Sequence, residues 1–124
     1  MIHIGANLSD DVFRFDLEHV VDNAFKANVK KIILTGTSVP ISQKAKTIAD
    51  KYTSSTEHKT SMLYSTAGIH PHKAKYFDSN SISELKKILD SKYVVAVVEC
   101  GLDYNSMLSP KEAQIFCLEE HLKL

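Results

Sequence analysis

Short apolar runs alternate with segments of helical periodicity four times along this chain of 124 residues. The expected strands cover residues 2–8, 30–36, 62–68 and 93–100. The expected helices, in which apolar residues recur at spacings of three and four, cover residues 16–29, 38–52, 82–89 and 109–124. Four strand–helix repeats of about thirty residues predict βα units in a parallel sheet, and therefore an α/β fold.

Local signals mark where several of these helices begin. Asp16 is a candidate N-cap of the first helix, and Ser38 followed by Pro40 is typical of a first helical turn. Ser81 and Glu84 have the spacing of a capping box, in which the two side chains bond the first free backbone N–H groups.

Residues 1–124 are expected to form one structural unit, because no low-complexity segment or linker interrupts them. The polar stretch 53–61 is the expected connection to the third strand. The nearly continuous apolar run over 93–100 predicts a strand covered on both faces. Four βα units with right-handed crossovers leave two architectures open, a small open parallel sheet or the first half of an eight-stranded barrel.

Composition excludes some classes of partner. Fifteen basic and fifteen acidic residues cancel, so no global field attracts nucleic acid or an anionic membrane, and any polyanion must be held locally. Neither a secretory signal nor an apolar run long enough to span a bilayer is evident. The two cysteines, Cys100 and Cys117, have no metal-site spacing, and we expect a reduced cytoplasmic protein in which Cys100 packs as a small apolar side chain.

Polar side chains cluster in the loops that follow three of the expected strands. Asn7 follows the first strand, His70 and His72 follow the third, and Glu99 and Asp103 follow the fourth. In α/β folds the loops at the carboxyl ends of the strands build the site, so these side chains are expected to converge at one rim. A carboxylate at the end of a buried strand needs a cation or hydrogen-bond donors, and this raises the question of what compensates Glu99.

Four motifs give the chain a resemblance to a known family. They are "IGANL" at residues 4–8, "TGTS" at 35–38, "STAGIHPH" at 65–72 and "VVAVVECGLDY" at 94–104. Their order and spacing resemble those of the TatD family of metal-dependent deoxyribonucleases, which are amidohydrolase-like (β/α)8 barrels. The resemblance implies that the four βα units correspond to the first half of a TIM barrel.

The resemblance also implies roles for the polar residues of the rim. Glu99 is the implied metal ligand, with Mg²⁺ as the expected cation and Mn²⁺ or Zn²⁺ as alternatives. His70 and Asp103 are the implied catalytic residues, through contact with phosphate and orientation of a water or a ligand. Asn7 and His72 are the implied substrate-binding residues. The implied reaction is hydrolysis of DNA, single-stranded or at 3′ ends, by a metal-activated water.

Two features depart from the family pattern. His3 stands where aspartate is usual. Family members have roughly twice this length, in keeping with the ~250 residues of a full barrel, and their later part supplies two histidine ligands and an aspartate. We therefore expect a truncated form of a longer enzyme, with closure of two copies into a homodimeric barrel as the alternative.

Other functions and plainer structural roles stay open at this point. The chain could be a catalytically inactive half-barrel that binds or self-associates, or an open-sheet module that binds a phosphorylated small molecule at the same rim. Glu99 could be a structural salt-bridged residue, the loop 70–72 a rigid turn and Asn7 a turn residue. Solvated surface positions are expected for His19, His58 and His121. A cytoplasmic location is expected, or the nucleus in a eukaryotic cell.

Overall fold

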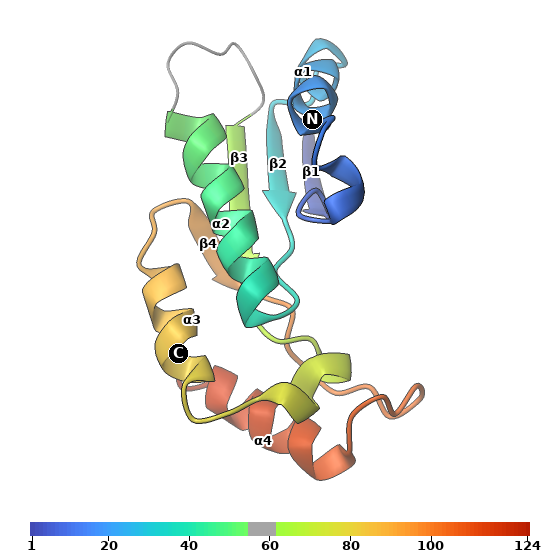
Figure 1. Ribbon diagram of the computed structural model, residues 1–124, viewed down its shortest axis with the longest axis vertical. Helices are drawn as coiled ribbons and strands as arrows, with labels where there is room; N and C mark the ends of the chain where they lie inside the picture. The colour runs from blue at the N-terminus through green and yellow to red at the C-terminus, as the bar shows by residue number, and fades with distance from the viewer. Residues whose placement is uncertain (55–61) are drawn as a thin grey trace.

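The computed structural model describes residues 1–54 and 62–124. Its four strands are β1 (Ile2–Ala6), β2 (Lys31–Leu34), β3 (Met62–Ala67) and β4 (Val94–Val97). They form one parallel sheet in the order β1-β2-β3-β4 (Figure 1). The predicted parallel α/β sheet is confirmed. Each crossover leads to the next strand on the same side, which is the order of a barrel and not that of a doubly wound open sheet.

In the part of the chain that the structure describes, four α-helices and two short 3₁₀ helices connect and follow the strands. They are η1 (Asp11–Phe13), α1 (Leu17–Lys26), α2 (Val39–Ser54), η2 (Pro71–Tyr76), α3 (Ser81–Leu89) and α4 (Lys111–His121). The four predicted helices are confirmed, with ends shifted by a few residues, whereas η2 replaces part of a predicted loop. Of the polar connection predicted over 53–61, the first two residues belong to α2 and residues 55–61 lie outside the described part. None of the described helices is long and apolar enough to cross a membrane.

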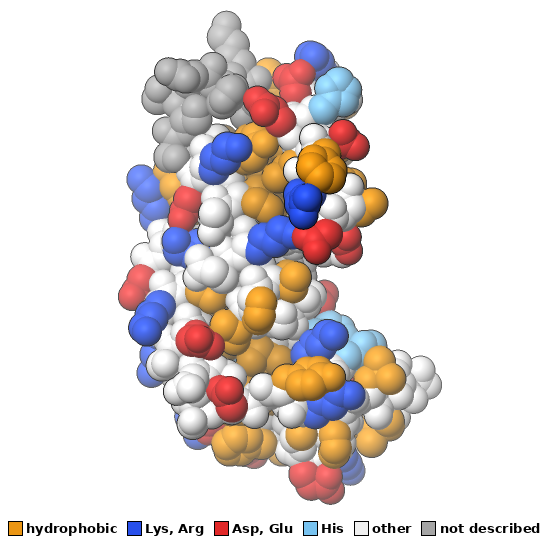
Figure 2. Space-filling view, in the orientation of Figure 1, with side chains coloured by type: hydrophobic (Ala, Val, Ile, Leu, Met, Phe, Trp, Pro, Cys, Tyr) orange, Lys and Arg blue, Asp and Glu red, His pale blue; other side chains and the backbone are white. Residues whose placement is uncertain are grey.

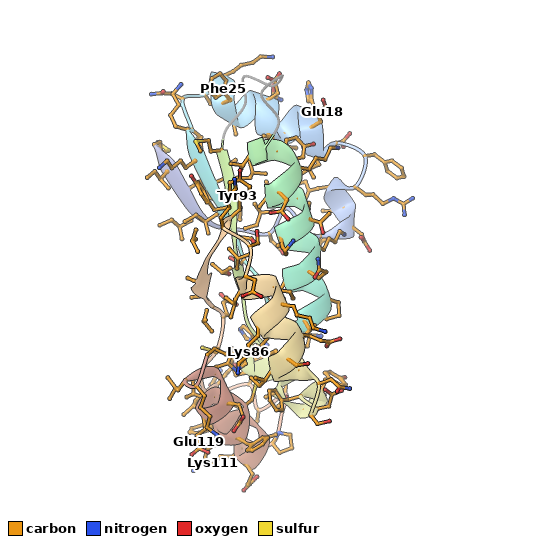
Figure 3. All side chains as sticks on the ribbon, turned by 90° about the vertical axis from the view of Figure 1, so that its left-hand side faces the viewer. Glu18, Phe25, Lys86, Tyr93, Lys111 and Glu119 are labelled. Atoms are coloured by element: carbon orange, nitrogen blue, oxygen red, sulfur yellow. The ribbon has the colours of Figure 1, made fainter. Side chains whose placement is uncertain are left out.

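The helices α1, α2 and α3 lie on one face of the sheet, as the side view in Figure 3 shows. Leu34 and Leu63 are fully buried on that face, within a core that also contains Val21 of α1. The other face of the sheet is open, and Ile4 there is 73% exposed. The prediction that residues 93–100 are covered on both faces is wrong for the described chain, because the helices pack on one side only.

A second apolar cluster extends from β3, β4 and α3 to the region beyond the carboxyl ends of these strands. There α4 packs against η2, and α3 packs against β4. Buried residues of this cluster are Ala67, Ile69, Ala74, Leu85, Ile88, Val94 and Cys117. It places η2 and α4 at the base of the molecule in Figure 1, where they support the loops that follow β3 and β4.

The starts of two helices agree with the sequence signals in different degrees. Ser38 Oγ accepts a hydrogen bond from the N–H of Ile41 at 3.4 Å, and Pro40 lies in the first turn of α2, as predicted. Asp16 occupies the N-cap position of α1, but its side chain makes no cap hydrogen bond.

The predicted capping box at α3 is wrong. Ser81 is the first residue of the helix and not its N-cap, and Glu84 forms no side-chain bond to it. The carboxylate of Asp78 caps the helix instead, since it accepts the N–H groups of Asn80 at 2.9 Å and Ser81 at 3.0 Å. These bonds lower the pKa of Asp78, the Asn80 N–H most of all. Asp78 therefore takes the Ser81 N–H that Glu84 is expected to accept, and the Ser81 hydroxyl accepts the N–H of Asp78 at 3.0 Å instead of that of Glu84.

Candidate active site at the carboxyl ends of the strands

Backbone hydrogen bonds tie the carboxyl ends of β2, β3 and β4 together. The N–H of Glu99 donates to the carbonyl of Gly36 at 3.0 Å, and the N–H of His70 donates to the carbonyl of Thr37 at 3.0 Å. Residues that follow β3 and β4 are thus both anchored on the loop that follows β2. This anchoring brings His70 and Glu99 to one rim, as the sequence predicts.

Two glycines allow this close approach. A Cβ on Gly68 would lie 2.9 Å from the carbonyl oxygen of Glu99 and 2.9 Å from the carbonyl carbon of Val98. A Cβ on Gly36 would lie 2.4 Å from Ser42 Oγ. Because a carbon atom does not fit at such distances, the glycines of "TGTS" and "STAG" are needed for the position of Glu99.

His70 and Glu99 face each other at the rim. His70 Nε2 lies 3.7 Å from Glu99 Oε2, which is longer than a hydrogen bond. His70 Nδ1 accepts the N–H of His72 at 3.1 Å, so in the neutral ring the proton is on Nε2 and points toward Glu99. The Glu99 side chain is 45% exposed and makes no hydrogen bond within the described residues. Its carboxylate is therefore available to a ligand.

His72 and Asp103 form a second pair beside the first. His72 Nε2 and Asp103 Oδ2 are hydrogen-bonded, and the rings of His70 and His72 pack edge to face with centroids 4.3 Å apart. Asp103 Oδ1 accepts the N–H groups of Asn105 and Ser106, each at 3.0 Å. The Ser106 N–H and then the His72 ring hold the pKa of the Asp103 carboxyl well below its usual range. Both oxygens of an ionised Asp103 are thus occupied.

Buried polar side chains beneath the rim hold this second pair in place. Gln114 of α4 accepts the N–H of Asp103 at 2.7 Å and donates to the carbonyls of Asp103 at 3.1 Å and Ser109 at 2.8 Å. Ser109 Oγ donates to the carbonyl of His72 at 2.9 Å and accepts the N–H of Lys75 at 3.1 Å. The sequence marks Ser109 only as a helix start, and it misses Gln114.

His121 is buried, with 4% of its surface exposed, so the prediction of a solvated position is wrong. Its Nε2 accepts the N–H of Ile69 at 3.0 Å, and its Nδ1 lies 2.7 Å from the carbonyl of Cys117. Nε2 is therefore the acceptor and Nδ1 the donor of this ring, which anchors Ile69, the residue before His70. Gln114, Cys117 and His121 share one stripe of α4 by their spacing, and this is the signal that could have located His121.

Two other predicted residues stand apart from these pairs. Asn7 is exposed, its carbonyl accepts the N–H of Asp10 at 3.1 Å, and within the described residues its side chain forms no hydrogen bond with the other four candidates. Its role in binding substrate stays a prediction. Burial raises the pKa of the Cys100 thiol, which disfavours a nucleophilic thiolate and agrees with a packing role.

The donor set offers one oxygen ligand for a cation. Glu99 is a hard carboxylate donor with no other bond in the described part, whereas both Asp103 oxygens are occupied. Within residues 1–54 and 62–124, no three potential ligands lie close enough together to hold a metal ion. The described residues therefore fit one ligand position, and not a complete metal site.

Comparison with known proteins relates the whole chain to one protein family. Residues 2–124 match the family described as TatD related DNase. The "3'-5' ssDNA/RNA exonuclease TatD" of Erwinia billingiae is 35% identical over 124 residues, which are 100% of this chain and 45% of that protein. The protein of the same name from Pantoea sp. (strain At-9b) is 36% identical with the same coverage.

Solved structures agree with the sequence comparison. A TatD family hydrolase from Entamoeba histolytica superposes with a TM-score of 0.86 and 28% identity, over 98% of this chain and 44% of that one. YjjV, a TatD homologue from Escherichia coli, superposes with a TM-score of 0.81 and 28% identity, over 99% of this chain and 45% of that one. The chain thus spans less than half the length of the relatives it matches.

Proposed function

Because the chain belongs to the TatD related DNase family, we propose that it contributes the Glu99 side of the active site of a divalent-metal-dependent nuclease. The reaction is hydrolysis of phosphodiester bonds. The observation that carries this proposal is the exposed Glu99 carboxylate, held at the end of β4 without a hydrogen bond in the described part and facing His70.

Glu99 serves as one ligand of the cation, with Mg²⁺ as the expected ion and Mn²⁺ or Zn²⁺ as alternatives. When bound, such a cation supplies a water of lowered pKa and neutralises negative charge that develops on the phosphate. The further ligands implied by the family resemblance belong to the part of the relatives that this chain does not match. A second copy that closes a homodimeric barrel is the other source of ligands.

His70 donates a hydrogen bond from Nε2 to a phosphate oxygen. The bond from the His72 N–H to Nδ1 supports this role, because it keeps the proton of the neutral ring on Nε2, the atom that faces the site. Asp103 is a positioning residue: it accepts the hydrogen bond of His72 and so orients that ring at the rim. His72 then contacts the substrate from the side of η2.

The substrate is a single-stranded nucleic acid end. The relatives named above are 3′-5′ exonucleases of single-stranded DNA and RNA, and the absence of net charge on this chain agrees with a substrate held locally at the site. The cytoplasm is the expected location.

The test is a chimera in which this chain replaces the matching 45% of the Erwinia billingiae relative. We expect Mg²⁺-dependent release of nucleotides from labelled single-stranded DNA, and a loss of at least about a hundredfold with Glu99→Gln. The matched control is Glu119→Gln, the same change at an exposed position of α4 (Figure 3). Equal activity of the two variants in a folded chimera would refute the role of Glu99.

A further inference from the structure

Because the chain has no net charge, a polyanion has to be bound by a local group of side chains, and one such group lies beside the rim. We propose that the lysine–tyrosine surface binds a single strand of nucleic acid and leads it to His70 and Glu99. This surface consists of Lys73, Lys75, Tyr76, Tyr104 and Lys111. The proposal rests on the proposed nuclease function and adds to it the path of the strand.

The first part of the surface is η2, which begins directly after His70. Tyr76 is 68% exposed, and the ammonium groups of Lys73 and Lys75 lie 5.9 Å and 5.3 Å from the centre of its ring. The sequence of η2, "PHKAKY", contains no carboxylate. Figure 2 shows Lys and hydrophobic side chains gathered over η2, beside pale blue histidine surface and next to the hollow on that side of the molecule.

The second part of the surface follows Asp103. Tyr104 is 45% exposed, and the Lys111 ammonium lies 4.9 Å from the centre of its ring. Ser109 joins this loop to η2, because its hydroxyl bonds the carbonyl of His72 and the N–H of Lys75. Three lysines against two tyrosines therefore lie on the two segments that carry His72 and Asp103.

The charges of this surface are available to a ligand. Elsewhere Lys26, Lys44 and Lys46 form ion pairs with Asp22, Asp11 and Asp50. Within the described residues, the three lysines of the lysine–tyrosine surface form no ion pair. Asp78, Asp103 and Glu112 lie near these lysines along the chain or in the fold, and Glu84 lines the same hollow as Lys73 and Tyr76. Asp78 and Asp103 bond backbone N–H groups and not these lysines. The three ammonium groups are therefore not held by a carboxylate, and they are placed to meet the phosphates of a strand.

Exposed aromatic rings with adjacent cations match the chemistry of a single strand. Unpaired bases stack on aromatic side chains irrespective of sequence, while ammonium groups meet the phosphates. In a duplex the faces of the bases are covered by their neighbours, so the rings have nothing on which to stack. The lysine–tyrosine surface is therefore selective for single strands near the site.

The test measures binding without hydrolysis. Fluorescence anisotropy of a labelled oligothymidylate of about ten nucleotides is recorded with the whole chain in EDTA. We expect Lys73→Ala with Lys75→Ala to reduce the slope of log affinity against log salt by about 1.4, since each lost phosphate contact contributes about 0.7. We expect Tyr76→Ala to weaken binding about tenfold and Tyr76→Phe to leave it unchanged.

The matched control is Lys30→Ala with Lys31→Ala. These lysines are exposed and also lie against aromatic rings, 4.4 Å from the centre of Phe25 and 5.8 Å from that of Tyr64, but at the opposite ends of the strands. We expect this variant to bind like the parent chain.

Several results would overturn the proposal. The proposal is wrong if the parent chain does not bind the oligonucleotide up to about millimolar concentration, or if it binds the duplex of the same sequence with equal affinity. It is also wrong if the two double-lysine variants bind equally, or if Tyr76→Ala binds like the parent chain. Because Tyr76 is exposed, its replacement does not threaten the fold. If Glu99→Gln loses hydrolysis but the surface variants bind like the parent chain, the proposed strand-binding role of the surface is wrong and the metal-ligand role of Glu99 is kept. Surface-dependent binding alongside full hydrolysis by Glu99→Gln would reject the metal-ligand role alone.

Discussion

Leu34 and Leu63 are fully buried between the sheet and α2, whereas the equally buried residues beneath the rim, Ser109 and Gln114, are polar. The helix-covered face of the sheet is held by apolar area removed from water, a contribution that many atoms share. The rim adds a few directed hydrogen bonds to the apolar cluster beneath it. Apolar packing tolerates small displacements, whereas the position of Asp103 depends on single donors and acceptors. Single substitutions can therefore displace the region that carries the proposed chemistry.

The largest effect is expected in the sheet core. Leu63→Ala removes a fully buried side chain and should lower the free energy of unfolding by about 3 kcal/mol, through lost transfer energy and a cavity. Chemical denaturation measures this change. The neighbouring Met62→Ala, at an exposed position of the same strand, should change it by less than about 1 kcal/mol. Similar losses in both variants would contradict the one-sided core.

Gln114→Leu tests the directed bonds beneath the rim. It leaves the N–H of Asp103 and the carbonyls of Asp103 and Ser109 without partners and should cost about 2 kcal/mol of stability. The amide of Asp103 should also exchange faster with solvent, which NMR can follow. The control is Gln43→Leu on the exposed side of α2, which should stay within about 0.5 kcal/mol. Unchanged exchange at Asp103 would show that the loop is held by other contacts.

Gly68→Ala tests the close approach at Glu99. The added methyl group meets the Val98–Glu99 backbone and should lower the free energy of unfolding by about 1.5 kcal/mol. The amide resonance of Glu99 should shift, while resonances of α1 should not. A parent-like melting temperature together with an unshifted Glu99 amide would mean that the rim has room at this point.

The smallest effect is expected from acid. Because the pKa of Asp103 is lowered in the folded chain, the unfolded chain binds the proton more tightly. The resulting stability is fully present above the ordinary aspartate pKa of about 4, and it is lost as the pH falls through the lower folded value. Asp103→Asn should therefore flatten the decrease in denaturation midpoint below about pH 4. If the denaturation midpoint decreased equally in the parent chain and the variant, Asp103 would not contribute to the loss of stability in acid.

Much of the fold could be predicted from the sequence because its signals are local. Apolar periodicity located all four strands and all four helices, and the motif glycines Gly36 and Gly68 proved to be sites of close backbone approach. The short helix η2 escaped prediction because a 3₁₀ helix of six residues has no apolar stripe. The capping box at Ser81 failed because Asp78 accepts the Ser81 N–H and the Asn80 carbonyl accepts the Glu84 N–H.

By itself the sequence determined the order of the βα units and the residue types that follow each strand, since both depend on neighbours along the chain. Only the tertiary structure decided the partners of the polar side chains. His72 meets Asp103 across 31 positions, and His121 meets Ile69 across 52. Such pairs exist only after the parallel strands bring their carboxyl ends together, and a buried polar group then bonds whichever partner the packing presents.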